Sequence, residues 1–121
     1  MAVILIATPD ATLQSIFAAE INAQGHALLW ALDGKEACDL VLSDQPQLVF
    51  LDPTLPIFNA FETCRLLRDD PQSPPGLPII ILSDDDVDSR RLNKCQATAC
   101  FPKTHLENDL RDLIVKYLFG H

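Results

Sequence analysis

Short apolar runs alternate with amphipathic segments from one end of the chain to the other. Residues 3–7, 27–31, 48–51 and 79–82 are almost wholly apolar, and residues 98–101 form another short run of this kind. Continuous apolar runs of four or five residues are typical of strands that are buried on both faces of a sheet. The pattern therefore predicts five buried strands.

The segment after each run places apolar residues at helical spacing. The first predicted helix starts at Thr8 as the cap, with Pro9 in the first turn and Asp10 at the positive end of the helix dipole, and it ends at Gly25. Others follow residues 33–34, 52–58 and 84–86, and the last spans about 106–119. The predicted inward positions are Leu13, Ile16, Phe17, Ile21, Ala37, Leu40, Val41, Phe61, Cys64, Leu66, Leu67, Leu110, Leu113, Ile114 and Tyr117.

Five strands that each precede a helix predict a parallel sheet with helices on both faces, in one domain over residues 2–119. A chain of 121 residues is the usual size of such a domain. Sites in open parallel sheets lie at the carboxyl ends of the strands. We therefore look for chemistry at Ala7, Thr8, Asp52, Ser83 and Lys103.

The net charge and the cysteine spacing exclude several classes of binding partner and site. The net charge is −8, which disfavours direct binding to nucleic acid or to anionic membranes. No apolar run is long enough to span a membrane, and no basic leader precedes the first run, so we expect a cytoplasmic protein. The cysteines form no zinc-binding spacing and are expected to be reduced: Cys38, Cys64, Cys95 and Cys100.

Asp52, Ser83 and Lys103 follow or end three predicted strands and would converge at one edge. A carboxylate, a hydroxyl and an ammonium group together suit the acceptance of a phosphoryl group, with the carboxylate as the nucleophile. The simpler alternative is that Asp52 caps the turn after its strand and that Lys103 is a solvated loop residue.

The chain resembles the receiver domain of bacterial two-component response regulators. The similarity rests on residues 48–56, Leu-Val-Phe-Leu-Asp-Pro-Thr-Leu-Pro, on the strand that ends at Ser83, and on Phe-Pro-Lys at residues 101–103. It implies a flavodoxin-like fold, a phosphoryl acceptor at Asp52, and Ser83 and Lys103 as contacts of the phosphoryl group. It also implies that Asp52 and the backbone carbonyl of Thr54 face Mg²⁺.

The chain departs from the family at the metal site. Two acidic residues that hold Mg²⁺ in the family are replaced by Ala7 and Thr8. Asp10 and Asp84 are the alternative carboxylates. We expect Asp10 to face solvent at the helix start, and Asp84 to face solvent or to repel phosphate rather than to hold a metal. Mg²⁺ binding should therefore be weak, and Lys103 should pair permanently with Asp52.

Three further departures concern the conformational switch. Cys100 stands where the family often has an aromatic ring, and Lys103-Thr104 replaces a Lys-Pro pair that is commonly joined by a cis bond. Ile57, Asn59 and Ala60 replace a looser, glycine-rich loop.

These features leave two functions open, neither of them enzymatic. The first is a phosphorylated receiver that takes its phosphoryl group from a histidine kinase or phosphotransfer protein and contacts a downstream protein through about residues 85–116. The second is a pseudo-receiver that binds a partner without phosphorylation. A flavodoxin-like cofactor binder is disfavoured because no glycine-rich loop follows the first strand. Whether the chain is a stand-alone protein or part of a larger one stays open.

Overall fold

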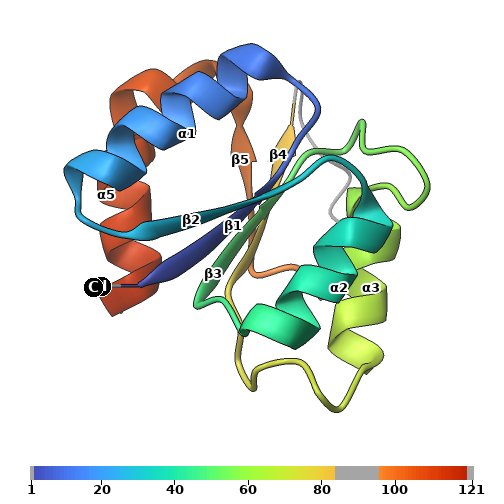
Figure 1. Ribbon diagram of the computed structural model, residues 1–121. Helices are drawn as coiled ribbons and strands as arrows, with labels where there is room; N and C mark the ends of the chain where they lie inside the picture. Colours follow the sequence, from blue (N-terminus) through green and yellow to red (C-terminus); the bar gives the residue numbers. More distant parts are fainter. Residues whose placement is uncertain (1, 84–95, 120–121) are drawn as a thin grey trace.

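The computed structural model describes residues 2–83 and 96–119, and the helix predicted between residues 84 and 95 lies outside them. The elements are arranged as alternating strands and helices (Figure 1). In chain order they are β1 (Val3–Ala7), α1 (Ala11–Ala23), β2 (Ala27–Ala31), α2 (Gly34–Asp44), β3 (Leu48–Leu51), α3 (Ala60–Asp69), β4 (Ile79–Ser83), β5 (Ala99–Pro102), the 3₁₀ helix η1 (Lys103–His105) and α5 (Leu106–Phe119).

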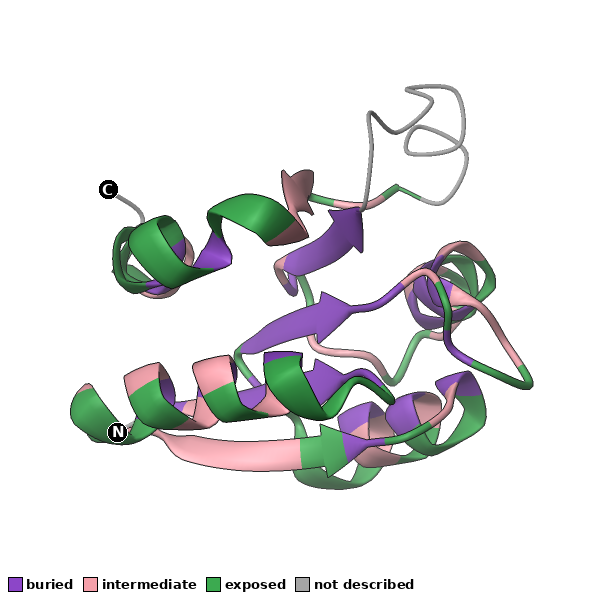
Figure 2. Ribbon diagram, turned by 90° about the horizontal axis from the view of Figure 1, so that it is seen from above, coloured by how far each residue is buried: buried purple, intermediate pink, exposed green. Residues whose placement is uncertain are grey.

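The five strands form one parallel sheet in the order β2-β1-β3-β4-β5. Helices α1 and α5 cover one face of the sheet, and α2 and α3 cover the other (Figure 1). The central strands β1, β3 and β4 are buried almost throughout, whereas β2 at one edge is partly open (Figure 2). The predicted three-layer α/β architecture is confirmed.

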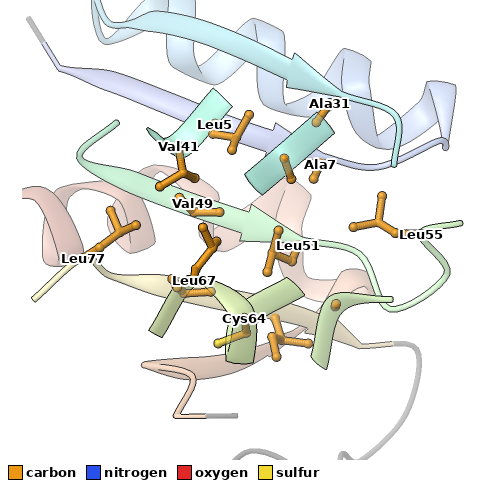
Figure 3. Close-up of a cluster of buried hydrophobic side chains, with 14 residues drawn as sticks. Leu5, Ala7, Ala31, Val41, Val49, Leu51, Leu55, Cys64, Leu67 and Leu77 are labelled. Atoms are coloured by element: carbon orange, nitrogen blue, oxygen red, sulfur yellow. The ribbon is translucent and has the colours of Figure 1, made fainter. Parts of the chain in front are cut away.

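Successive side chains of each strand point to opposite faces of the sheet, so the hydrophobic core consists of two clusters. Leu5 and Val49 pack with α2 and α3 in one cluster, which Figure 3 shows between the sheet and these helices. Ile4 and Phe50 pack with α1 and α5 in the other cluster. Because successive strand residues point to opposite faces, runs without polar positions are what a sheet covered on both sides requires.

Two details of the helices differ from the sequence prediction. Helix α1 starts at Ala11 and is capped by Asp10, whose Oδ1 accepts hydrogen bonds from the backbone amides of Thr12 and Leu13 at 2.8 and 3.3 Å. The predicted cap at Thr8 is wrong because Asp10 occupies the N-cap position of α1. The inward position predicted for Leu66 is also wrong, since that side chain is 47% exposed and lies beside the buried stripe of α3.

Gly34 is the point where α2 approaches the loop before α3 most closely. A Cβ atom at this position would collide with the carbonyl oxygen and Cβ of Phe58 and with the Thr63 hydroxyl. We expect Gly34→Ala to lower the free energy of unfolding by about 1–3 kcal/mol, although alanine is the better helix former. Urea unfolding measures this, with the exposed Lys35→Ala on the same helix as a control that should cost below about 0.5 kcal/mol. Equal stability of Gly34→Ala and the wild type would show that the loop yields freely.

Candidate functional site

The carboxyl edge of the sheet brings together four of the predicted site residues. Asp52 follows β3, Thr8 follows β1, Ser83 ends β4, and Lys103 opens η1 directly after β5. Parallel strands end at the same edge, so their following residues are neighbours in space even though they are far apart in sequence. Asp52 and Thr8 are wholly buried, and Ser83 is only 4% exposed.

The Asp52 carboxylate accepts hydrogen bonds at both oxygens. Its Oδ1 accepts from the backbone amide and the hydroxyl of Thr54, both at 2.9 Å, and from Lys103 Nζ at 3.0 Å. Its Oδ2 accepts from the Thr8 hydroxyl at 2.7 Å. The side chain of Lys103 is 15% exposed and that of Asp52 is 1% exposed, so this ion pair is largely shielded from water.

These contacts bear on the simpler alternative, in which Asp52 caps the turn after its strand and Lys103 is a solvated loop residue. Lys103 is not a solvated loop residue, because its ammonium group is paired with a buried carboxylate. Asp52 does cap the turn after β3, through the Thr54 amide, and it takes part in the ion pair at the same time. The described contacts of Asp52 do not include one from Ser83, so the predicted contact of Ser83 with a phosphoryl group stays a prediction.

Thr8 has a role that the sequence analysis missed. Its hydroxyl oxygen accepts a hydrogen bond from the Asp10 amide at 3.1 Å and donates its proton to Asp52 Oδ2. Its carbonyl accepts from the Gln14 side chain at 3.0 Å. The signal is the strand register: Ala7 pairs with the last residue of β3, so the residues that follow each strand must lie side by side.

The environment of Asp52 has opposing effects on its pKa. Burial raises the pKa of the carboxyl group, because the charged form loses water. Hydrogen bonds to the charged form act in the other direction, the Thr54 amide first, then Thr8, Lys103 and the Thr54 hydroxyl. The net effect is a pKa below the ordinary value of 3.8, so Asp52 is ionised at neutral pH.

The lowered pKa gives a stability prediction. A carboxylate with a depressed pKa stabilises the folded state above its unfolded pKa of about 3.9, and this contribution is lost as the pH falls through the folded value. We expect the free-energy difference between the wild type and Asp52→Asn to be constant above about pH 5 and to shrink steadily below about pH 4. Urea unfolding over this range measures it. A difference that does not change with pH would contradict the lowered pKa.

At this edge of the sheet, the described residues offer Asp52 as a buried carboxylate for a magnesium ion. Mg²⁺ is usually held by one or two carboxylates together with waters. Here the last position of β1 carries an apolar Ala7 and the next position a neutral Thr8, and both oxygens of Asp52 already face hydrogen-bond donors. Within residues 2–83 and 96–119, no three His, Cys, Asp or Glu side chains are grouped so that they could bind a metal ion. Asp10 is exposed and caps α1, and Asp84 lies outside the described residues.

Two further departures from the family pattern, Cys100 and the bond between Lys103 and Thr104, lie within the described residues. Cys100 lies on β5 and is half-buried, Cys38 on α2 is also half-buried, and Cys64 on α3 is buried. Cys95 is outside the described residues. No peptide bond in the described residues is cis, which includes the bond between Lys103 and Thr104.

No helix in the described part of the chain is long and apolar enough to cross a membrane.

A parallel sheet in the order 2-1-3-4-5, with polar residues at its carboxyl edge, places the protein in the class of flavodoxin-like α/β domains. The family model for the response regulator receiver domain matches residues 4–115. The chain therefore belongs to the response regulator receiver domain family. Receiver domains of this kind are regulatory signalling modules of two-component systems.

Relatives and solved structures agree with this assignment. The response regulator MprA of Mycolicibacterium vanbaalenii is 33% identical over 96 residues, which cover 79% of this chain and 40% of that protein. The Mycobacterium avium protein of the same name is 31% identical over 96 residues, with 79% and 41% covered. The chain thus spans about 40% of the length of these relatives.

Two solved structures show the same fold. The chemotaxis response regulator CheY4 of Vibrio cholerae has a TM-score of 0.88 at 19% identity. The similarity covers 98% of this chain and 99% of the CheY4 chain. The receiver domain of the sensor histidine kinase PA1611 from Pseudomonas aeruginosa has a TM-score of 0.83 at 18% identity, with 98% of each chain covered. That structure has a magnesium ion coordinated in its active-site cleft.

Proposed function

We propose that this chain is a receiver in which Asp52 is the phosphoryl acceptor, that it accepts phosphoryl groups only weakly, and that it signals through protein–protein contacts. The observation that carries the proposal is the buried Asp52–Lys103 pair at the carboxyl edge of the sheet. An ionised carboxylate is the nucleophile that such a transfer needs. The ammonium group beside it balances charge on the incoming oxygens.

The proposed donor is a histidine kinase or a phosphotransfer protein. An oxygen of the Asp52 carboxylate attacks the phosphorus atom of a phosphohistidine. A new O–P bond forms, the P–N bond breaks, and the imidazole leaves with the electron pair of that bond. The product is an acyl phosphate on Asp52, with Lys103 in place to pair with one of its oxygens.

Phosphoryl transfer to Asp52 should be slow because the described residues of the site hold few positive charges. Phosphoryl transfer depends on the neutralisation of charge on the transferring oxygens, and Lys103 supplies one positive charge. The positions that hold Mg²⁺ in the family carry Ala7 and Thr8, and neither side chain brings a second cation to the site. Neutral hydroxyl groups leave much of the developing charge uncompensated.

The proposed partner surface was expected over residues 85–116. Residues 85–95, with Arg90, Arg91 and Lys94, lie outside the described residues. Lys103 does not belong to an open surface, because its side chain is 15% exposed and bound to Asp52. On the following helix, α5, Val115 and Phe119 are exposed large apolar residues, and we propose that this helix forms the described part of the partner surface.

A second candidate is a pseudo-receiver that binds its partner without phosphorylation. The hydrogen bond from Thr8 to Asp52 Oδ2 favours it, because both carboxylate oxygens are then engaged in the unmodified protein. A site whose donors and acceptors are already matched has little to gain from a bound phosphoryl group.

The test is the intact mass of the protein after incubation with acetyl phosphate, with and without Mg²⁺, and with Asp52→Asn as the control. We expect slow addition of one phosphoryl group that requires Asp52 and responds little to Mg²⁺. No addition under conditions that label an ordinary receiver would contradict acceptance from a small donor and favour the pseudo-receiver. Fast addition that requires Mg²⁺ would contradict the weak metal site.

A further inference from the structure

We propose that Thr8 is a positioning residue that restrains the reactive oxygen of Asp52 and thereby slows its phosphorylation. This inference rests on the proposed function of Asp52 and goes beyond the loss of a metal ligand. It concerns what the Thr8 hydroxyl does, rather than what an acidic side chain at the same position would have done.

The direction of the Thr8 hydroxyl is fixed by its two partners. The oxygen accepts from the Asp10 amide at 3.1 Å, so its own proton is left to point at Asp52 Oδ2, 2.7 Å away. Thr8 is wholly buried and its carbonyl is held by the Gln14 side chain, so the hydroxyl cannot turn to water instead. A hydrogen bond with both ends fixed in this way is a durable restraint.

The two oxygens of Asp52 are unequal. Oδ1 accepts three hydrogen bonds, from the Thr54 amide, the Thr54 hydroxyl and Lys103 Nζ, whereas Oδ2 accepts one from the described residues. Attack on phosphorus needs a free lone pair, so Oδ2 is the oxygen positioned to react. Among the contacts of the described residues, the hydrogen bond at Oδ2 comes from Thr8, so this hydroxyl competes with the incoming phosphorus.

The step that Thr8 slows can be written with a small donor. Asp52 Oδ2 attacks the phosphorus of acetyl phosphate, a new O–P bond forms, and the P–O bond to the acetyl group breaks, with its electron pair leaving on acetate. Before or during this step the hydrogen bond from Thr8 to Oδ2 must weaken. Without that hydroxyl the lone pair is available from the start.

The experiment compares the initial rates of Asp52 labelling by acetyl phosphate in the presence of Mg²⁺. The variants are Thr8→Val, which keeps the shape and removes the hydroxyl, and Thr8→Ser, which keeps the hydroxyl. We expect Thr8→Val to label about tenfold faster than the wild type, in line with the strength of a hydrogen bond to a charged group. Thr8→Ser should label at the wild-type rate. Thermal unfolding checks that both variants fold, and Thr8→Ala replaces Thr8→Val if it does not.

A second readout follows the hydroxyl itself. A buried hydroxyl with two fixed partners should give a slowly exchanging proton signal in the NMR spectrum, close to the Asp10 amide proton, in the wild type and in Thr8→Ser. Absence of this signal from the wild type would overturn the inference. So would equal labelling rates for the wild type and Thr8→Val, with the proposed function still standing. No labelling of Asp52 in any variant would overturn both.

Discussion

Lys103→Met is expected to lower the free energy of unfolding by about 2–4 kcal/mol at neutral pH. The substitution leaves the Asp52 carboxylate buried, and its remaining donors among the described residues are the neutral groups of Thr8 and Thr54. A buried charge without its counterion is far more costly than the intact pair, because the desolvation of the carboxylate is no longer offset. Urea unfolding of the two proteins at the same pH measures the loss.

The double variant Lys103→Met with Asp52→Asn is the control for this prediction. Because the neutral amide needs no counterion, adding Asp52→Asn should recover most of the stability that Lys103→Met loses. Acidification should act in the same direction, since protonation of Asp52 removes the unpaired charge. A loss below about 0.5 kcal/mol for Lys103→Met would mean that the pair is too well solvated to matter.

Thr8→Asp is expected to convert the site into one that requires Mg²⁺. A second carboxylate beside Asp52 provides the oxygen ligands that Mg²⁺ prefers, and it repels Asp52 when no metal is bound. We expect lower stability than the wild type without Mg²⁺, recovery of stability with Mg²⁺, and acetyl phosphate labelling that rises about 100-fold when Mg²⁺ is added. Thermal unfolding and intact mass, each with and without Mg²⁺, measure these effects.

Thr8→Asn is the matched control, since it has the same shape as aspartate but carries no charge. It should show neither the Mg²⁺-dependent stability nor the Mg²⁺-dependent labelling. If Thr8→Asp behaves like Thr8→Asn, the identity of this residue does not govern metal binding, and the explanation of the weak site from residues 7 and 8 is wrong.

The sequence predicted the sheet well because its strands are buried on both faces. Runs such as residues 3–7 and 79–82 contain no polar position that could face solvent, so a covered parallel strand is the simplest structure that fits them. The convergence of Asp52 and Lys103 followed from the same pattern, because each residue comes directly after a strand. The resemblance to receivers then gave the pair a function.

The contacts within the site depend on information that a linear pattern does not carry. The hydrogen bond from Thr8 to Asp52 requires β1 and β3 to be neighbours with Ala7 opposite Leu51, and this register is set by the assembled sheet. The helix cap was also predicted wrongly. A threonine before Pro9 is a good cap by local rules, but the Thr8 hydroxyl oxygen accepts from the Asp10 amide, which lies before α1, and the Asp10 side chain caps the helix.

We propose that hydrogen-bond donors, rather than a metal ion, hold the Asp52 carboxylate. The most direct test is a Mg²⁺ titration followed by the backbone amide NMR signals of Thr8, Asp52 and Thr54. We expect no saturating shift of these signals up to about 10 mM Mg²⁺. Saturable shifts with a dissociation constant below about 1 mM, lost in Asp52→Asn, would contradict it.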